Sequence, residues 1–299
     1  MELYLLDILL VTFIILYLLI ASIFDIKTRE VPDLLSYSLI IIALSLRLIF
    51  SIISKEFSFF ISGLIGFVVF FIVANFMYYT RQWGGGDAKL LMGIGAALPI
   101  YPQSLIGYFN PSLNQIPFLL VLFLNLIIIG AAYALVYSII LSIRYKDKIG
   151  KEFSSILSSK HFAKTRKIIV FSCLAILVYG LLQPEKVTRV IISMVIFSIL
   201  FLFYLIIFLK AAEKAVLIKK IDVKRLTPGD WVNQKVIKKE VLYDPKKGYG
   251  ITQKQINNIL SSGIKEVEIK EGMPFVPSFF IAIILTLLYG NIIFRIMGI

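Results

Sequence analysis

The chain has 299 residues, 59% of them hydrophobic, and carries a formal net charge of +13. Because soluble domains are only about half apolar, this composition indicates an integral membrane protein. One cysteine and one histidine exclude disulfide frameworks, Cys/His zinc sites and Cys–His catalysis, so we expect neither a metal nor a cofactor. We attribute the positive charge to the cytoplasmic excess of Lys and Arg in membrane proteins. The expected partner is therefore the lipid bilayer, not nucleic acid.

Eight apolar segments are predicted to lie in the membrane. The fourth is twelve residues long and stops before Pro99. It would extend only about 18 Å, short of a hydrocarbon core of ~30 Å. Its alanines and glycines allow close approach by neighbouring helices, so we place it in the centre of the bundle. The segments cover residues 3–24, 33–53, 57–79, 87–98, 116–143, 168–183, 187–209 and 274–297.

The polar stretch 210–271 is too long for an ordinary connection and is predicted to fold. Residues 226–232 resemble a turn entering a strand, and residues 251–262 a helix that ends at Gly263. Alternating side chains over 264–270 predict another strand.

These elements predict an all-α polytopic membrane protein with about eight membrane helices. A small α+β cytoplasmic domain is inserted before the last of them. The expected domains are a membrane helical core over 1–209, the soluble domain over 210–272 and a C-terminal membrane helix over 273–299.

Lys and Arg are distributed unevenly between alternate loops. Loops one, three, five and seven hold 26 of the 31, which places these loops in the cytoplasm and both termini outside. Asp25 follows the first span and Asp87 opens the fourth, so both are predicted to lie at the cytoplasmic face of the cell membrane.

Asp87 directly follows three glycines and begins an apolar helix. A carboxylate at the edge of a membrane segment is costly to keep there, which makes it a candidate functional residue. The alternative is an ordinary helix N-cap. Asp25, in the corresponding place after the first span, favours the functional interpretation.

Two carboxylates that share a site can divide the work of hydrolysis, because like charges close together cannot both ionise. One activates water while the other, still protonated, polarises the carbonyl. We therefore predict Asp25 and Asp87 as a catalytic pair. Asp87 begins a helix near Lys89 whereas Asp25 ends one, so we assign Asp87 as the base and Asp25 as the proton donor.

Gly84, Gly85 and Gly86 are predicted to support substrate binding. Glycine permits close backbone approach, so an extended substrate strand could pair with main chain exposed at these residues. Lys89 is expected to support the same site.

These residues resemble the type IV prepilin peptidase family of GxGD intramembrane aspartic proteases, and within it the archaeal preflagellin and prepilin peptidases. The family's first signature, an Asp followed by basic residues and Ile/Val-Pro, matches residues 25–32. The second, Gly-x-Gly-Asp-x-Lys-Leu, matches residues 84–90, and a late Pro-Phe-x-Pro element loosely matches 274–277. The resemblance covers about residues 15–100 and carries a catalytic role onto Asp25 and Asp87 only.

The resemblance implies a substrate: the basic leader of a class III signal peptide, cut from a pilin-like or archaellin precursor at the cytoplasmic face. The paired CxxC motifs of many bacterial relatives are absent, so their methylation activity is not implied. The choice between archaellin and pilin substrates and the oligomeric state stay open.

Two other classes of membrane protein also use paired intramembrane aspartates. A presenilin or signal-peptide-peptidase type of protease normally pairs GxGD with Tyr-Asp and a late Pro-Ala-Leu, whereas here the first acid follows Phe24 and no Pro-Ala-Leu occurs. An ion-coupled transporter using Asp25 and Asp87 would require polar groups near the midplane on several helices, and few are present.

Overall fold

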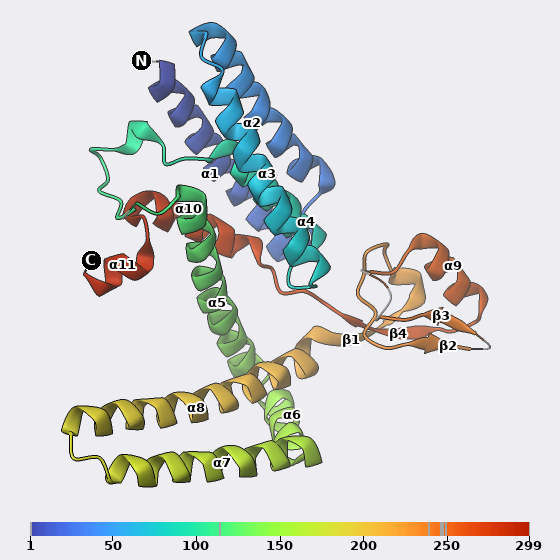
Figure 1. Ribbon diagram of the computed structural model, residues 1–299. Helices are drawn as coiled ribbons and strands as arrows, with labels where there is room; N and C mark the ends of the chain where they lie inside the picture. The colour runs from blue at the N-terminus through green and yellow to red at the C-terminus, as the bar shows by residue number, and fades with distance from the viewer. Residues whose placement is uncertain (1, 114, 239, 246–247, 249, 299) are drawn as a thin grey trace. The chain divides into compact units, whose positions relative to one another are not determined.

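The computed structural model describes residues 2–113, 115–238, 240–245, 248 and 250–298, and it is mostly helical (Figure 1). The chain forms two compact units, one of Met1–Ala134 with Gly272–Ile299 and one of Leu135–Glu271. Among the described residues, five helices are long and apolar enough to cross a membrane, so a multi-pass membrane protein is supported while the predicted count of eight is not confirmed. These five cover Tyr4–Thr28, Asp33–Ser54, Ser58–Tyr79, Phe118–Arg144 and Lys186–Leu217.

The first unit is built around a short helix, α4, which spans Gly85–Ala97 and packs against α1, α2 and α3. Most of its side chains from Ala88 to Ala97 are buried, in agreement with the predicted central position. The other elements of this unit are α1 (Glu2–Thr28), α2 (Asp33–Ser54), α3 (Ser58–Tyr79), a 3-10 turn at Gln103–Leu105, the first part of α5 (Phe118–Arg144), α10 (Val276–Tyr289) and α11 (Ile292–Met297).

Glycine-to-glycine contact sets the distance between α3 and α4. A Cβ atom added to Gly95 would lie 2.3 Å from the carbonyl oxygen of Gly66, and one added to Gly66 would lie 2.1 Å from that of Gly95. At Gly93, an added Cβ would lie 2.6 Å from the side chain of Leu39 in α2. The small residues therefore bring α4 against two neighbours, as expected for helices that associate in a membrane.

The last predicted span, 274–297, is wrong as a single helix because the chain breaks at Gly290. Gly290 has a φ of +72° and ends α10, and the Asn291 side chain then accepts hydrogen bonds from Ile293 N and Phe294 N to begin α11. Asn125 of α5 supports the break by donating hydrogen bonds to Thr286 Oγ1 at 2.9 Å and Gly290 O at 2.7 Å.

The second unit contains helices and a small sheet region. Helix α6 (Lys146–Ser158) lies between the predicted membrane segments 116–143 and 168–183, where no helix is predicted. Its Ile149, Phe153 and Ile156 pack together with residues at the end of α8. Helices α7 (Lys160–Leu181) and α8 (Lys186–Ala212) contact each other, and α8 continues into a π-helical turn, Glu213–Leu217.

The sheet region confirms two of the predicted elements. Strand β1 (Ile218–Asp222) pairs antiparallel with β4 (Glu266–Lys270), and β2 (Val236–Ile237) pairs with β3 (Val241–Tyr243). Helix α9 (Gln253–Ser261) is followed by Gly263 with a φ of +79°, as the sequence predicted. Over 226–232 the predicted turn is present, with Gly229 at a φ of +104°, but the strand after it is reduced to an isolated bridge between Val232 and Ile269. Residues 210–272 as a separate cytoplasmic domain stay a prediction.

We expect the sheet region to be removable without disturbing the first unit. Ile218 faces Lys270 across the antiparallel pair, so deleting 219–269 leaves two chain ends already side by side. Joined by a short glycine linker, the shortened chain should give a single monodisperse peak in detergent and keep the thermal unfolding temperature of the first unit. Complete loss of folded protein would contradict this expectation.

Candidate active site

Asp25 lies in the last turn of α1, and its side chain is buried, with 5% of its surface exposed. Its Oδ2 accepts a hydrogen bond of 2.8 Å from the backbone N–H of Val276. Val276 is the first residue of α10, whose own N-cap residue, Phe275, provides no side-chain cap. Asp25 therefore caps a helix whose first residue lies 251 residues further along the chain, and that bond fixes the orientation of its carboxyl group.

Asp87 is the third residue of α4 and is partly buried. Its Oδ2 accepts a hydrogen bond of 3.1 Å from Gly84 N, the partner expected of an acid in the first helical turn. The predicted N-cap alternative is wrong in position, because Gly84 is the N-cap residue. Asp87 also lies close enough to Asp25 for the two carboxyl groups to interact electrostatically.

The structure weakens the basis for placing the proton on Asp25. The sequence predicts Asp25 only at a helix C-terminus, where the dipole disfavours negative charge. Its bond to Val276 N also places it at the N-terminus of α10, where negative charge is favoured. Both carboxyl groups therefore lie at helix N-termini, and the assignment of Asp87 as base and Asp25 as donor stays a prediction.

Lys89 is directed to Asp33 and not to the aspartate pair. Its Nζ lies 2.5 Å from Asp33 Oδ1 and 4.8 Å from the centre of the Tyr37 ring. This ion pair joins the first turn of α2 to α4 at a position two residues after Asp87. The predicted supporting role of Lys89 in substrate binding stays a prediction.

The three glycines have different surroundings. A Cβ atom added to Gly86 would lie 3.2 Å from Val31 Cβ, so glycine there makes room for the loop between α1 and α2. A Cβ atom added to Gly84 would lie 3.3 Å from Asp87 Oδ2, and one added to Gly85 would lie 3.8 Å from the Tyr78 ring. Gly84 is exposed at the start of α4, where the predicted pairing with a substrate strand is still open to test.

Sequence reasoning missed two parts of this site: the backbone N–H of Val276 and an aromatic cluster beside it. The Trp83 ring lies 6.0 Å from the Phe275 ring and 5.2 Å from the Phe279 ring, measured between centroids. Arg29 Nη1 also donates a 3.1 Å hydrogen bond to Gly272 O, just before α10. The signal was the late Pro-Phe-x-Pro element, since Pro277 is typical of a helix start.

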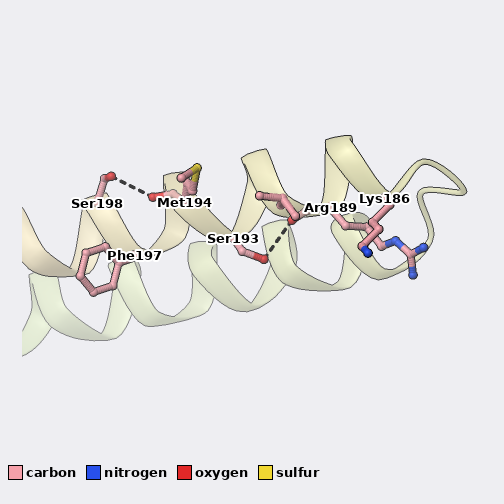
Figure 2. Close-up of a pocket in the computed structure, with 7 residues that line it drawn as sticks. Lys186, Arg189, Ser193, Met194, Phe197 and Ser198 are labelled. Atoms are coloured by element: carbon pink, nitrogen blue, oxygen red, sulfur yellow. Dashed lines mark hydrogen bonds between the residues drawn. The ribbon is translucent and has the colours of Figure 1, made fainter. Parts of the chain in front are cut away.

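A pocket of about 810 Å³ lies along α8 and belongs to the second unit (Figure 2). It contains neither Asp25 nor Asp87. The hydroxyl groups of Ser193 and Ser198 donate to backbone carbonyls of their own helix, those of Arg189 and Met194. None of the seven lining residues is an acid, a histidine or a cysteine, so the pocket offers no pair of carboxyl groups for the hydrolysis predicted from the sequence.

The fold and the site together define a multi-pass helical membrane protein with two interacting carboxyl groups at helix ends. Residues 12–135, a stretch that includes both aspartates, match the type IV leader peptidase family. The resemblance expected from the two motifs is thereby confirmed over this region. No solved structure matches the chain.

Three curated relatives are named preflagellin peptidase. The protein from Methanocaldococcus jannaschii is 43% identical over 84 residues, which are 28% of this chain and 36% of the relative. The one from Methanococcus voltae is 36% identical over 118 residues, 38% of this chain and 50% of the relative. The one from Methanococcus maripaludis is 30% identical over 141 residues, which are 46% of this chain and 60% of the relative. The chain thus spans between about one third and three fifths of the length of these relatives.

Proposed function

We propose that this chain is a membrane aspartic endopeptidase that removes the basic leader peptide from archaellin or pilin-like precursors. The proposal is supported by Asp25 at the end of α1 and Asp87 at the start of α4, whose carboxyl groups lie close enough to interact electrostatically. The name shared by the three relatives, preflagellin peptidase, supports proteolysis over ion transport.

In the proposed reaction, the ionised carboxylate takes a proton from a water molecule, and the water oxygen attacks the scissile carbonyl carbon. The protonated carboxyl group donates its proton to the carbonyl oxygen, giving a neutral tetrahedral diol. The C–N bond then breaks, the departing amine takes a proton from the first carboxyl group, and a diol hydroxyl returns its proton to the second. The products are the leader with a new carboxyl end and the mature chain with a new amino end.

The proposed site faces the cytoplasm. The support is the distribution of Lys and Arg, 26 of 31 in alternate loops that include those next to Asp25 and Asp87. With this orientation both termini lie outside, and the basic leader of a precursor lies on the same side of the membrane as the aspartates.

The activity is tested with purified protein in detergent and a synthetic precursor that carries a basic leader followed by an apolar segment. We expect a single cut before the apolar segment, seen as two product masses by mass spectrometry. The same precursor with its leader in reversed order serves as the control and should stay whole. Absence of any cut in archaellin-like and pilin-like precursors alike would contradict the proposed function.

A further inference from the structure

The C-terminal end of α4 is buried inside the protein. In a membrane protein no water is available there to form hydrogen bonds with the last backbone carbonyl groups of the helix. Helix α4 has 13 residues, so it extends about 20 Å and ends short of a full crossing. Ala96 and Ala97 at its end are 0% exposed. The last carbonyl groups of a helix have no partner within the helix, and in a membrane they must find one in the protein.

Arg47 of α2 supplies these partners. Its side chain is 4% exposed, and it donates from Nε to Ala96 O at 2.9 Å and from Nη2 to Ala97 O at 2.8 Å. Its third nitrogen, Nη1, donates to Phe59 O at 3.1 Å and Ser62 Oγ at 3.2 Å, both on α3. One guanidinium group therefore connects three helices at the end of α4, and its positive charge suits a helix C-terminus.

The surroundings are shaped to hold this side chain. A Cβ atom added to Gly63 of α3 would lie 2.3 Å from Arg47 Cδ, so glycine leaves the space that the arginine occupies. The charge of Arg47 interacts with buried Asp7 of α1, which in turn accepts a 3.2 Å hydrogen bond from Ser104 N. Since a buried charge is costly without a partner, Asp7 and Arg47 depend on each other.

Asp87 lies at the other end of the same helix, ten residues from Ala97 and about 15 Å away along the axis. A helix packed this closely moves as a unit, so a shift at Ala97 is transmitted to Asp87. A misplacement of ~1 Å in a catalytic group can cost roughly 100-fold in rate. We propose that Arg47 is a positioning residue that sets the place of Asp87 relative to Asp25 by holding the far end of α4.

The test uses Arg47→Gln and Arg47→Lys, with Arg295→Gln as the matched control because Arg295 is exposed in the same unit. All carry Trp231→Phe, which leaves Trp83 as the one tryptophan of the sequence. Trp83 directly precedes the N-cap residue of α4 and is 6% exposed, so quenching of its fluorescence by acrylamide reports movement at the Asp87 end without any substrate. Cleavage kinetics supply the second readout, and this readout rests on the proposed function.

In Arg47→Gln we expect kcat to fall roughly 10- to 100-fold with KM unchanged, and Trp83 quenching to rise. Arg47→Lys should recover part of the rate. An ammonium group keeps the positive charge but cannot donate the two parallel hydrogen bonds that the guanidinium group makes to Ala96 O and Ala97 O. Arg295→Gln should match the parent. If Arg47→Gln gives no folded protein, kcat and Trp83 quenching are measured on Arg47→Lys instead, and these two measurements decide whether Arg47 positions α4.

Unchanged kcat and unchanged quenching in the Arg47 variants would overturn the proposal. So would a fall in kcat without a change in Trp83 quenching, because α4 would then still be in place. If the parent cuts no precursor, the proposed function fails, and Trp83 quenching alone decides on Arg47: a rise supports the positioning role and no change overturns it.

Discussion

Replacing either Asp25 or Asp87 by Asn is expected to reduce precursor cleavage by roughly 10²- to 10⁴-fold, the usual contribution of a general acid or base. Asn keeps the size of the side chain and can still accept a hydrogen bond. The bonds from Val276 N and Gly84 N can therefore persist while the acid–base chemistry is lost. The measurement is the initial rate of product formation by mass spectrometry, normalised to monodisperse protein.

Asp147→Asn is the control for that experiment, because Asp147 is exposed in the first turn of α6, in the second unit. It should cleave at the parental rate. A full rate in Asp25→Asn or in Asp87→Asn would show that the changed residue is not part of the chemistry, and the catalytic pair would have to be abandoned.

Gly95→Ala is expected to destabilise the first unit by about 1–3 kcal/mol, the usual cost of overpacking. The new methyl carbon would lie 2.3 Å from Gly66 O and 2.9 Å from Phe70 Cβ. Because the nearer atom is backbone, α3 and α4 would have to separate. Activity should fall as well, since α4 carries Asp87. The change is measured as the unfolding free energy in mixed detergent micelles with increasing SDS.

Gly150→Ala provides the comparison for Gly95→Ala. Apart from its chain neighbours and the nearby backbone of its own helix, no atom lies within 4 Å of the position where the Gly150 methyl group would be. Ala also favours a helix over Gly by roughly 0.5–1 kcal/mol. This variant should unfold at the same SDS concentration as the parent or a higher one. Equal stability of Gly95→Ala and the parent would contradict the close packing of α3 on α4.

The long apolar helices and the short α4 could be predicted because their sequence patterns are strong and local. The predicted helix 87–98 begins two residues later than the observed Gly85–Ala97 and ends one residue later. Glycine is a poor helix former, so the prediction starts the helix at Asp87. The break at Gly290 was missed although Gly-Asn is typical of one helix ending and another beginning. Helix α6 was missed because its charges hid an apolar face with helical spacing.

The aspartate pair could be predicted because both acids occur at the edges of apolar segments, where a charge is unusual. Their supporting contacts could not, because they join residues far apart in the sequence. Val276 N bonds Asp25 from 251 residues away, and Arg47 bonds Ala96 O from 49 residues away. From the sequence, Arg47 is one of the five Lys and Arg residues outside the four predicted cytoplasmic loops, and its local pattern does not point to these contacts.

The central claim is that Asp25 and Asp87 act as one catalytic unit, and a double-mutant cycle on cleavage tests it most directly. The parent, Asp25→Asn, Asp87→Asn and the double variant are compared in single-turnover experiments with the same precursor. Residues that act as a unit are strongly non-additive, so the double variant should be no slower than either single variant. If instead the loss of rate in the double variant equals the product of the two single losses, the aspartates act independently. That result would contradict a shared mechanism.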